Sequence, residues 1–396
     1  MRVRVVVSGF GIISPGASDV EGFDTMLKNE QHALQVLANQ GPNGEDLLFG
    51  LVNGEYETIA GTNYRRYPRV CRLAIAAADE AWQRAELPRT GGNNRTAVIV
   101  ATSVGSLREI DQLTLRAHYE PFRTYPITTV GVANTSSVGS AIAAHFNVTG
   151  PVYTLTTSCT GSADAIFLAK LLLETGQVDR CIVGGADAPV VQSSVYGFVK
   201  IRGISMSNKL EEVGVPFSET SNGFVMSEGS AILIVEREET AMRRGAHQFG
   251  YIETSRPTHD AVSIFSSDPE GNGLIEAMRG LVADREPSYV HSQALGLAEN
   301  DRIEKKLHET LFSHQVPITS IKGAIGHPFA AVGAIQAISA LLSIEHSYIP
   351  ATIRTDLNGF EKLPIVTATR YCKIDRVAVT NHGYGGSNNC FLLSST

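Results

Sequence analysis

The chain has 396 residues, of which 43% are hydrophobic and 18% charged, and its formal net charge is −7. This composition is typical of a well-packed globular protein that is long enough for two domains or two similar halves. The negative balance argues against nucleic acid or an anionic membrane as the main partner. The chain opens without a signal-peptide pattern, and we expect no membrane-spanning segment, so the sequence favours a cytoplasmic protein.

The five cysteines are an odd number, widely spaced, without any Cys-x-x-Cys pair. This pattern disfavours a disulfide framework or a zinc site and favours a reducing compartment. We therefore expect no metal. The cysteines stand at positions 71, 159, 181, 372 and 390.

Strand-like and helical patterns alternate along the chain. Runs rich in Val, Ile and other strand formers are followed by Ala-rich stretches with helical spacing, which is typical of an α/β fold whose sheets are covered by helices. In chain order the strand-like runs are 3–9, 96–103, 181–187, 230–236, 288–292 and 377–383.

The stretch "TLTTSCTGSADAIFLAKLLL", residues 154–173, places Cys159 between a β-branched run and an apolar helical pattern. The cysteine is therefore predicted at a strand-to-helix turn, where the partial positive charge of the helix start favours thiolate over thiol. Free cysteines in large intracellular chains also serve as small packing residues. From this stretch alone, a nucleophile and a core residue remain equal alternatives.

A faint internal duplication appears when residues 154–235 are laid beside residues 318–393. In each segment a strand leads to a polar residue at the start of a very apolar helix, Cys159 in the first and His327 in the second. Both helices are too apolar to be anything but buried. We expect a boundary near residue 245, which gives halves 1–245 and 246–396.

Several motifs, in order along nearly the whole chain, resemble those of the β-ketoacyl-acyl-carrier-protein synthases, a branch of the thiolase superfamily. The resemblance implies a thiolase-like α/β fold of two similar halves in a five-layered αβαβα arrangement. It also implies a dimer that pairs edge strands near the nucleophile. The motifs are "VVVSGFGIISPGAS" at the start, "RLAIAAADEAW", "TSCTGSADAI", "VPFSETSNGFVMSEGSAILIVE", "IKGAIGHPFAAVGAI" and "NHGYGGSN" near the end.

In this family a cysteine takes an acyl chain from the phosphopantetheine arm of an acyl carrier protein, and two histidines assist decarboxylation of the malonyl carrier. The resemblance makes Cys159 the nucleophile, which a helix start suits. It makes His327 a neutral donor to the thioester oxygen and Lys322 a supporting residue. The backbone N–H of Cys159 and one from the "NHGYGGSN" turn, which begins around His382, would form the oxyanion hole. No cofactor is implied.

The sequence departs from the family where the second histidine belongs. In "YVHSQALGLAENDRIE" the histidine position falls on Gln293, and the family's glycine and threonine positions fall on Ala294 and Leu295. His291 lies two residues away, on the same face of a strand and about 6 to 7 Å distant, so it could replace the histidine only after a rearrangement. At the mouth of the acyl pocket, His382 stands where the family commonly has phenylalanine.

Three hypotheses follow from these departures. The chain is a condensing enzyme in which Gln293 donates to the malonyl thioester, an acyltransferase with impaired decarboxylation, or a non-elongating partner of a heterodimeric ketosynthase, like a chain-length factor. We favour an acyltransferase subunit of type II fatty-acid or polyketide synthesis that binds acyl carrier protein and pairs with itself or a paralogue. A binding or scaffold protein is the alternative from another class. Thiolase itself is disfavoured because Cys390 lies beyond the glycine-rich turn.

Overall fold

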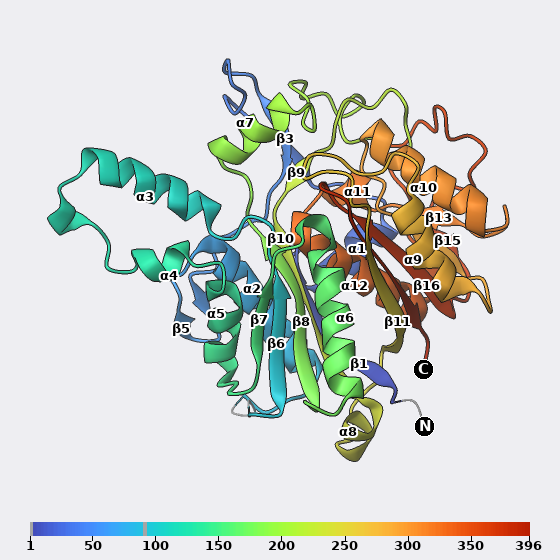
Figure 1. Ribbon diagram of the computed structural model, residues 1–396, viewed down its shortest axis with the longest axis horizontal. Coiled ribbons are helices and arrows are strands. Elements are labelled where there is room, and N and C mark those ends of the chain that lie inside the picture. Colours follow the sequence, from blue (N-terminus) through green and yellow to red (C-terminus); the bar gives the residue numbers. More distant parts are fainter. Residues whose placement is uncertain (1–2, 90–92) are drawn as a thin grey trace.

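The computed structural model describes residues 3–89 and 93–396, and Figure 1 shows an α/β body with one projecting arm. Ten strands form one mixed sheet in the order β13-β12-β16-β17-β11-β1-β10-β8-β6-β7. The strands of the first half are β1 (Val5–Ile13), β6 (Thr96–Ala101), β7 (Val152–Leu155), β8 (Arg180–Asp187) and β10 (Gly229–Arg237). Those of the second half are β11 (Gly250–His259), β12 (Tyr289–His291), β13 (Ile318–Thr319), β16 (Arg376–His382) and β17 (Ser387–Ser394).

The two halves of this sheet have the same connectivity. In the first half the spatial order is β1-β10-β8-β6-β7, and in the second it is β11-β17-β16-β12-β13. In both, the first strand pairs antiparallel with the last, and the strand that leads into the central helix lies at the outer edge. This repetition explains the duplication detected in the sequence, and the six strand-like runs all fall on strands.

The two halves meet at a short seam between β1 and β11. Val6 lies opposite Tyr251 and Val7 opposite Gly250, in antiparallel register. The register of each strand shifts beside the seam, on β1 between Val7 and Gly9 and on β11 between Ile252 and Thr254. Bulges of this kind increase the local twist, so the two five-stranded groups leave the plane of a single flat sheet.

Helices cover and separate the two groups of strands. Helix α6 (Gly161–Glu174) packs on β6 and β8, and α12 (Val332–His346) packs on β10 and β16, so these two lie between the halves. The outer layers are α2 (Arg69–Arg84) with α5 (Ser137–Phe146) on the first half, and α9 (Asn272–Val282) with α10 (Ala298–Leu311) on the second. This confirms the expected five-layered arrangement of two similar halves.

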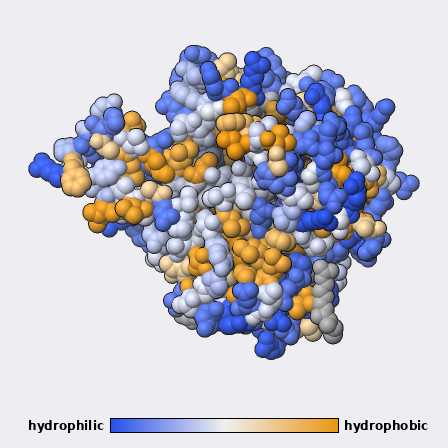
Figure 2. All heavy atoms as spheres, in the orientation of Figure 1, coloured by the Kyte–Doolittle hydropathy of each residue, from blue (hydrophilic) through white to orange (hydrophobic). Residues whose placement is uncertain are grey.

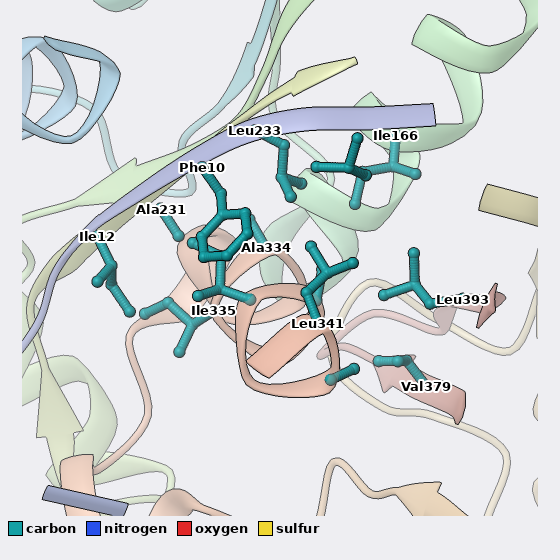
Figure 3. Packing of buried hydrophobic residues seen from close by; sticks show 14 of the residues in the cluster. Phe10, Ile12, Ile166, Ala231, Leu233, Ala334, Ile335, Leu341, Val379 and Leu393 are labelled. Carbon is teal, nitrogen blue, oxygen red and sulfur yellow. The ribbon is translucent and has the colours of Figure 1, made fainter. Parts of the chain in front are cut away.

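The largest core cluster lies between the layers, around α6 and α12. Figure 3 shows Phe10 of β1 and Leu233 of β10 packed against Ile335 and Leu341 of α12, with Val379 of β16 on the far side. The side chains in this cluster are almost fully buried. Because strands of both halves contribute to it, the two central helices hold the halves at a fixed distance.

Shorter elements surround this body. Helix α3 (Leu107–Tyr119) and α4 (Thr129–Ala133), joined through η1 (Phe122–Thr124), form the arm that projects from the body in Figure 1. The remaining strands are β2 (Leu34–Leu37), β3 (Leu47–Gly50), β4 (Thr58–Ile59), β5 (Thr62–Asn63), β9 (Met226–Ser227), β14 (Tyr348–Ile349) and β15 (Arg370–Tyr371). The remaining helices are α1 (Val20–Lys28), η2 (Ser158–Thr160), α7 (Gln192–Lys200), α8 (Glu238–Arg243), α11 (Lys322–Ile325) and η3 (Phe329–Ala331). Residue 245, the expected boundary, lies between α8 and β11.

The burial expected for both central helices holds for α12 and was wrong in part for α6. Every residue of α12 from Val332 to Ser343 is buried. On α6, in contrast, Leu171 is 40% exposed and Phe167 and Leu168 are partly exposed. Phe329–His346 also reaches the length and apolarity of a membrane span, contrary to expectation, but 83% of it is buried inside the protein. It is the core helix α12 with the turn before it.

Candidate active site

Cys159 lies at the turn between β7 and α6, as the sequence predicts. It is the middle residue of the short helix η2, and the residue before it, Ser158, has a positive φ of 54°. This left-handed residue turns the chain sharply from strand to helix, so that the next side chain stands at the end of the sheet. The Sγ of Cys159 lies 3.0 Å from Nε2 of His327. The structure therefore brings the two polar helix-start residues of the opposite halves into direct contact.

Two glycines allow the central helices to approach closely at this point. A Cβ on Gly161 would lie 3.2 Å from the Cβ of Ala330, and one on Gly333 would lie 3.0 Å from Oγ of Ser162. The Ser162 hydroxyl in turn accepts the N–H of Ala334 at 2.9 Å. The two helix starts are thus locked together at backbone distance, which fixes the spacing between Cys159 and His327.

The buried carboxylate of Asp187 also joins the two halves, and sequence reasoning missed it. It is the last residue of β8 and accepts the N–H groups of Ser103, Val104 and Ala330, the last at 2.8 Å. Ala330 is the middle residue of η3 and therefore the true structural counterpart of Cys159. His327 lies three residues before that position. The internal duplication in the sequence paired Cys159 with His327, and this pairing was wrong by three residues.

The glycine-rich turn between β16 and β17 closes the site from the other side. A Cβ on Gly383 would lie 3.3 Å from the backbone nitrogen of Cys159, so a larger residue there would press on the nucleophile. The backbone N–H groups of Tyr384 and of Cys159 itself work to lower the pKa of the thiol. The turn thus supplies a backbone N–H through Tyr384, whereas His382 contributes a side chain.

Burial outweighs the helix start in setting the protonation of the nucleophile. Burial and the nearby charge of Asp187 raise the pKa of Cys159 to about 12, although the Tyr384 N–H and Lys322 work in the opposite direction. The expected thiolate is therefore absent from the resting site. Cys159 as a residue is partly exposed, but its thiol is surrounded by protein groups and has no adjacent permanent cation among the described residues, so it keeps its proton until a base removes it.

His327 is the base within reach, and it is neutral. Burial, with the charges of Lys322 and His382, lowers the pKa of His327 to about 3. Its ring stacks on Phe329 with centroids 5.2 Å apart and meets the edge of Phe224 at 5.5 Å. Its Nδ1 has no hydrogen-bond partner among the described residues. A neutral ring held in this way can take the thiol proton or donate an N–H to an oxygen that gains charge.

Lys322 lies in the same buried cluster, at the start of α11. Its Nζ donates to the carbonyl oxygen of Ser292 at 3.0 Å. Burial lowers the pKa of Lys322 to about 7, even though the charges of Glu304 and Asp301 favour the cation. No ion pair with Nζ is formed among the described residues, so Lys322 acts on its neighbours through its field.

The carboxamide of Gln293 is bound to groups of β16. Its Nε2 donates to the carbonyl of His382 at 3.4 Å, and its Oε1 accepts the Nδ2 of Asn381 at 3.1 Å. Asn381 also donates to Oε1 of Gln336 on α12 at 2.5 Å. Three buried carboxamides thus bind one another at the place where the family has its second histidine. Gln336 had no signal in the sequence beyond its place on an apolar helix.

His291 does not replace the missing histidine in this structure. It ends β12 and is fully buried, and its Nδ1 lies 3.3 Å from Nε2 of Gln336. Burial and the charge of Lys322 lower its pKa well below the usual range. Its ring is therefore a neutral part of the core behind the carboxamides.

His382 and Glu304 form a buried pair beside the glycine turn. Nε2 of His382 lies 3.0 Å from Oε1 of Glu304, and the two side chains are 3% and 0% exposed. The other carboxylate oxygen accepts the hydroxyls of Ser292 at 2.7 Å and Thr380 at 2.8 Å. Burial alone would raise the pKa of Glu304, but the His382 imidazole and these hydroxyls lower it. In the sequence Glu304 marked only the end of the departing motif.

The other cysteines lie away from this cluster. Cys71, Cys181 and Cys390 are buried, and burial raises the pKa of each. Cys390 stands in β17, away from the turn. Cys372 is the second partly exposed thiol. Within residues 3–89 and 93–396, no group of three or more His, Cys, Asp or Glu side chains is placed to hold a metal ion.

As a whole, the cluster can transfer an acyl group. It offers a thiol, a neutral imidazole at 3.0 Å and a backbone N–H at the reacting sulfur. These are the nucleophile, the proton acceptor and the beginning of an oxyanion site that acyl transfer from a thioester requires.

Comparisons with known proteins agree with this geometry. The family model "Beta-ketoacyl synthase, N-terminal domain" matches residues 2–241, and "Beta-ketoacyl synthase, C-terminal domain" matches residues 249–356. The tetracenomycin polyketide synthase ketoacyl synthase alpha subunit of Streptomyces glaucescens is 26% identical over 99% of this chain and 97% of its own. A 3-oxoacyl-[acyl-carrier-protein] synthase 2 of Synechocystis is 28% identical over 98% and 97%.

Solved structures share the fold along the whole chain. "The ishigamide ketosynthase/chain length factor" matches with a TM-score of 0.91 at 23% identity and full coverage of both chains. A ketosynthase in complex with its chain length factor from Xenorhabdus doucetiae matches with a TM-score of 0.87 at 25% identity, covering 100% of this chain and 98% of that one. The family and fold predicted from the motifs are confirmed.

Proposed function

Since the chain belongs to the beta-ketoacyl synthase family, we propose that it is an acyltransferase subunit of type II fatty-acid or polyketide synthesis. It takes an acyl chain from an acyl carrier protein onto Cys159. The observation that carries this proposal is the 3.0 Å contact between Cys159 Sγ and His327 Nε2 at the junction of the halves. A chain that had kept only the fold would not need to bring a thiol and a neutral imidazole together across 168 residues of sequence.

In the acyl-transfer step the sulfur of Cys159 attacks the thioester carbonyl, and the bond between that carbonyl and the pantetheine sulfur breaks. His327 accepts the thiol proton as the attack proceeds and returns it to the departing pantetheine thiol. The negative oxygen of the tetrahedral intermediate is met by backbone N–H groups, of which that of Tyr384 already faces the thiol. The transient charge on His327 explains why a neutral resting ring is useful.

The finer part of the proposal is that decarboxylation is impaired. Release of carbon dioxide from a malonyl thioester leaves negative charge on the thioester oxygen, and one of the family's two imidazole donors is missing. The hydrogen bonds of Gln293 to Asn381 and to the His382 carbonyl support this, because its amide serves the second half of the sheet and not the nucleophile. Losing one such donor costs about two to three orders of magnitude in rate.

A partner subunit is supported by the exposed apolar surface around α6 and the arm. Figure 2 shows apolar side chains gathered over α6 and along the α3–α4 arm on one face of the molecule. The strand β7 lies at the edge of the sheet, with Tyr153 44% exposed. On the arm, Phe122 is 92% exposed and Ile127 97% exposed. Apolar surface of this extent beside an unpaired edge strand marks a protein interface.

The alternative is a non-elongating partner of a heterodimeric ketosynthase. This alternative is favoured by the ketosynthase–chain-length-factor complexes among the similar structures and by the loss of the second imidazole. The presence of Cys159 in contact with His327 favours the acyltransferase. The cytoplasmic location stays a prediction.

The experiment follows two products, the acylated protein and carbon dioxide. The purified chain is incubated with an acyl carrier protein loaded with a short acyl group, and its intact mass is measured over time, with Cys159→Ala as control. Carbon dioxide release from malonyl carrier protein is measured in the same preparation. We expect acylation that depends on Cys159 and little or no carbon dioxide release. A chain that stays unmodified would contradict the acyltransferase, and rapid carbon dioxide release would contradict impaired decarboxylation.

A further inference from the structure

The glycine turn that faces the nucleophile is flanked by a buried polar pair, His382 and Glu304. His382 is the last residue of β16, and residues 383–386 form the turn that leads into β17. The imidazole of His382 lies 3.0 Å from Glu304 Oε1, and both side chains are excluded from solvent. Each of these two buried polar atoms has no other polar partner among the described residues, so the contact is the one polar interaction that can offset the cost of burying them.

Glu304 is itself fixed by two further donors. It belongs to α10, on the outer side of the second half, and its second oxygen accepts the hydroxyls of Ser292 and Thr380. Thr380 Oγ1 also accepts the backbone N–H of Gln293 at 3.0 Å. One carboxylate on a helix thus holds the ends of two neighbouring strands, β12 and β16, at the edge of the sheet where the nucleophile lies.

The turn that this carboxylate holds is the one that contacts Cys159. A Cβ on its first residue, Gly383, would lie 3.3 Å from the backbone nitrogen and 3.5 Å from the Cβ of Cys159, so the turn packs directly against the nucleophile. On the opposite side Ser267 donates to the Gly383 carbonyl at 3.1 Å, and Gly386 O accepts the N–H of Asp260 at 2.8 Å. The glycines themselves offer no side chains to resist motion, so the position of the turn depends on its flanking residues.

We propose that His382 and Glu304 are positioning residues that hold the glycine turn, residues 383–386, against Cys159. An aromatic hydrocarbon at position 382 could pack there but could not form a polar contact with α10. In this chain the mouth of the acyl site is therefore held by polar contacts with Glu304 of an outer helix. The inference rests on the proposed acyl transfer for its kinetic consequence, while its structural part concerns the turn alone.

The experiment compares Glu304→Gln, His382→Phe, the double variant and His382→Gln. Hydrogen exchange of a peptide covering residues 380–387 reports the stability of the turn, and the rate of Cys159 acylation by an acyl thioester is measured against thioester concentration. We expect the turn peptide of Glu304→Gln and His382→Phe to exchange about tenfold faster. Their maximal acylation rate should fall about tenfold, with half-saturation changed less than about twofold, because the transition-state donor is loosened and substrate binding is not.

The double variant and His382→Gln test whether His382 and Glu304 act through their contact with each other. The double variant should lose no more than the worse single variant, because both remove the same contact. His382→Gln keeps an N–H donor that can reach the carboxylate, and it should restore part of the protection and of the rate. A double variant whose loss is the product of the two single losses would overturn the proposal.

His308→Gln is the matched control. His308, like His382, is a buried histidine, and it lies on α10 one turn beyond Glu304. Its Nε2 contacts the carbonyl of Val316 at 2.8 Å, away from the site. This variant should lose stability without faster exchange in the turn or slower acylation per folded molecule. Unchanged exchange in both Glu304→Gln and His382→Phe would overturn the proposal. If the native chain is never acylated, the proposed function fails, and the exchange measurement still decides the positioning role.

Discussion

The start of α6 and the start of α12 are built on the same backbone plan but differ in what surrounds them. Each begins with a residue of positive φ, Ser158 at 54° and Phe329 at 48°, followed by a short 3-10 helix. The middle residue is the partly exposed Cys159 in one case and the fully buried Ala330 in the other. The repeated turn supplies a geometry, and the position of each turn relative to solvent decides which of them can carry a nucleophile.

The helices that follow differ in the same sense. α12 is buried from Val332 to Ser343, whereas α6 leaves Leu171 and part of Phe167 at the surface, next to the edge strand β7. The central helix of the first half therefore has an open side, and the corresponding stretch of α12 has none. This difference places both the reactive thiol and the candidate interface on the first half.

The largest effect is expected when the thiol at the start of α6 is removed. Cys159→Ala should abolish the acyl-enzyme and lower acyl transfer by at least about 10³-fold, because covalent catalysis has no substitute nucleophile in the site. Intact mass after incubation with an acyl carrier is the measurement. Cys372→Ser, which removes the other partly exposed thiol, should change nothing. Acyl mass retained in Cys159→Ala would assign the nucleophile to another residue.

The open side of α6 is tested by charge. Leu171→Lys places a cation in the apolar surface beside β7, and we expect dimer dissociation to become about tenfold to a hundredfold easier because the charge would be desolvated on association. Light scattering across a dilution series is the measurement. Met242→Lys on α8, also a strongly exposed apolar residue, is the control. Equal effects of the two substitutions would remove α6 from the interface.

The burial of Lys322 in the second half predicts that the free energy of unfolding depends on pH. The pKa of Lys322 is about 7 in the folded chain, against the usual 10.5. Between these values the unfolded chain binds a proton that the folded chain does not, so the free energy of unfolding rises with pH across this window, by a few kcal/mol in all.

Lys322→Met should flatten this rise and stabilise the protein most below pH 7. Denaturant unfolding at pH 6, 8 and 10 is the measurement, and Lys373→Met, at a side chain 83% exposed, is the control. A variant that keeps the native slope would show that another buried group causes it.

The smallest effect is expected at Gln293. Gln293→His should raise carbon dioxide release from malonyl carrier protein less than about threefold, because the side chain at this position faces Asn381 and the His382 carbonyl and not Cys159. The release rate per folded molecule is the measurement. A gain of tenfold or more would mean that the loop after β12 moves to bring position 293 to the substrate.

The sequence predicted the fold because the patterns that define it are local. The strand before Cys159, the sharp turn and the apolar helix are read from neighbouring residues, and the second half repeats them. The family motifs then placed Cys159, His327 and Lys322 in one site, and the structure brings the first two into contact.

What the sequence missed depends on burial and on contacts between distant residues. A helix start favours thiolate, but the enclosed site raises the pKa of Cys159 to about 12. Asp187 and Glu304 appeared as isolated acids, because their donors come from elements that are up to 143 residues apart. The direction of the Gln293 carboxamide likewise depends on Asn381, which lies 88 residues further along the chain.

The contact of Cys159 with His327 has a consequence for how the protein matures during synthesis. The nucleophile leaves the ribosome well before its imidazole, and the turn with Tyr384 follows only near the end of the chain. Because a chain is made from its N-terminus, the thiol of the first half lacks both proton acceptor and oxyanion donor until the second half has been made. The order of translation thereby delays reactivity until the last two strands, β16 and β17, are in place.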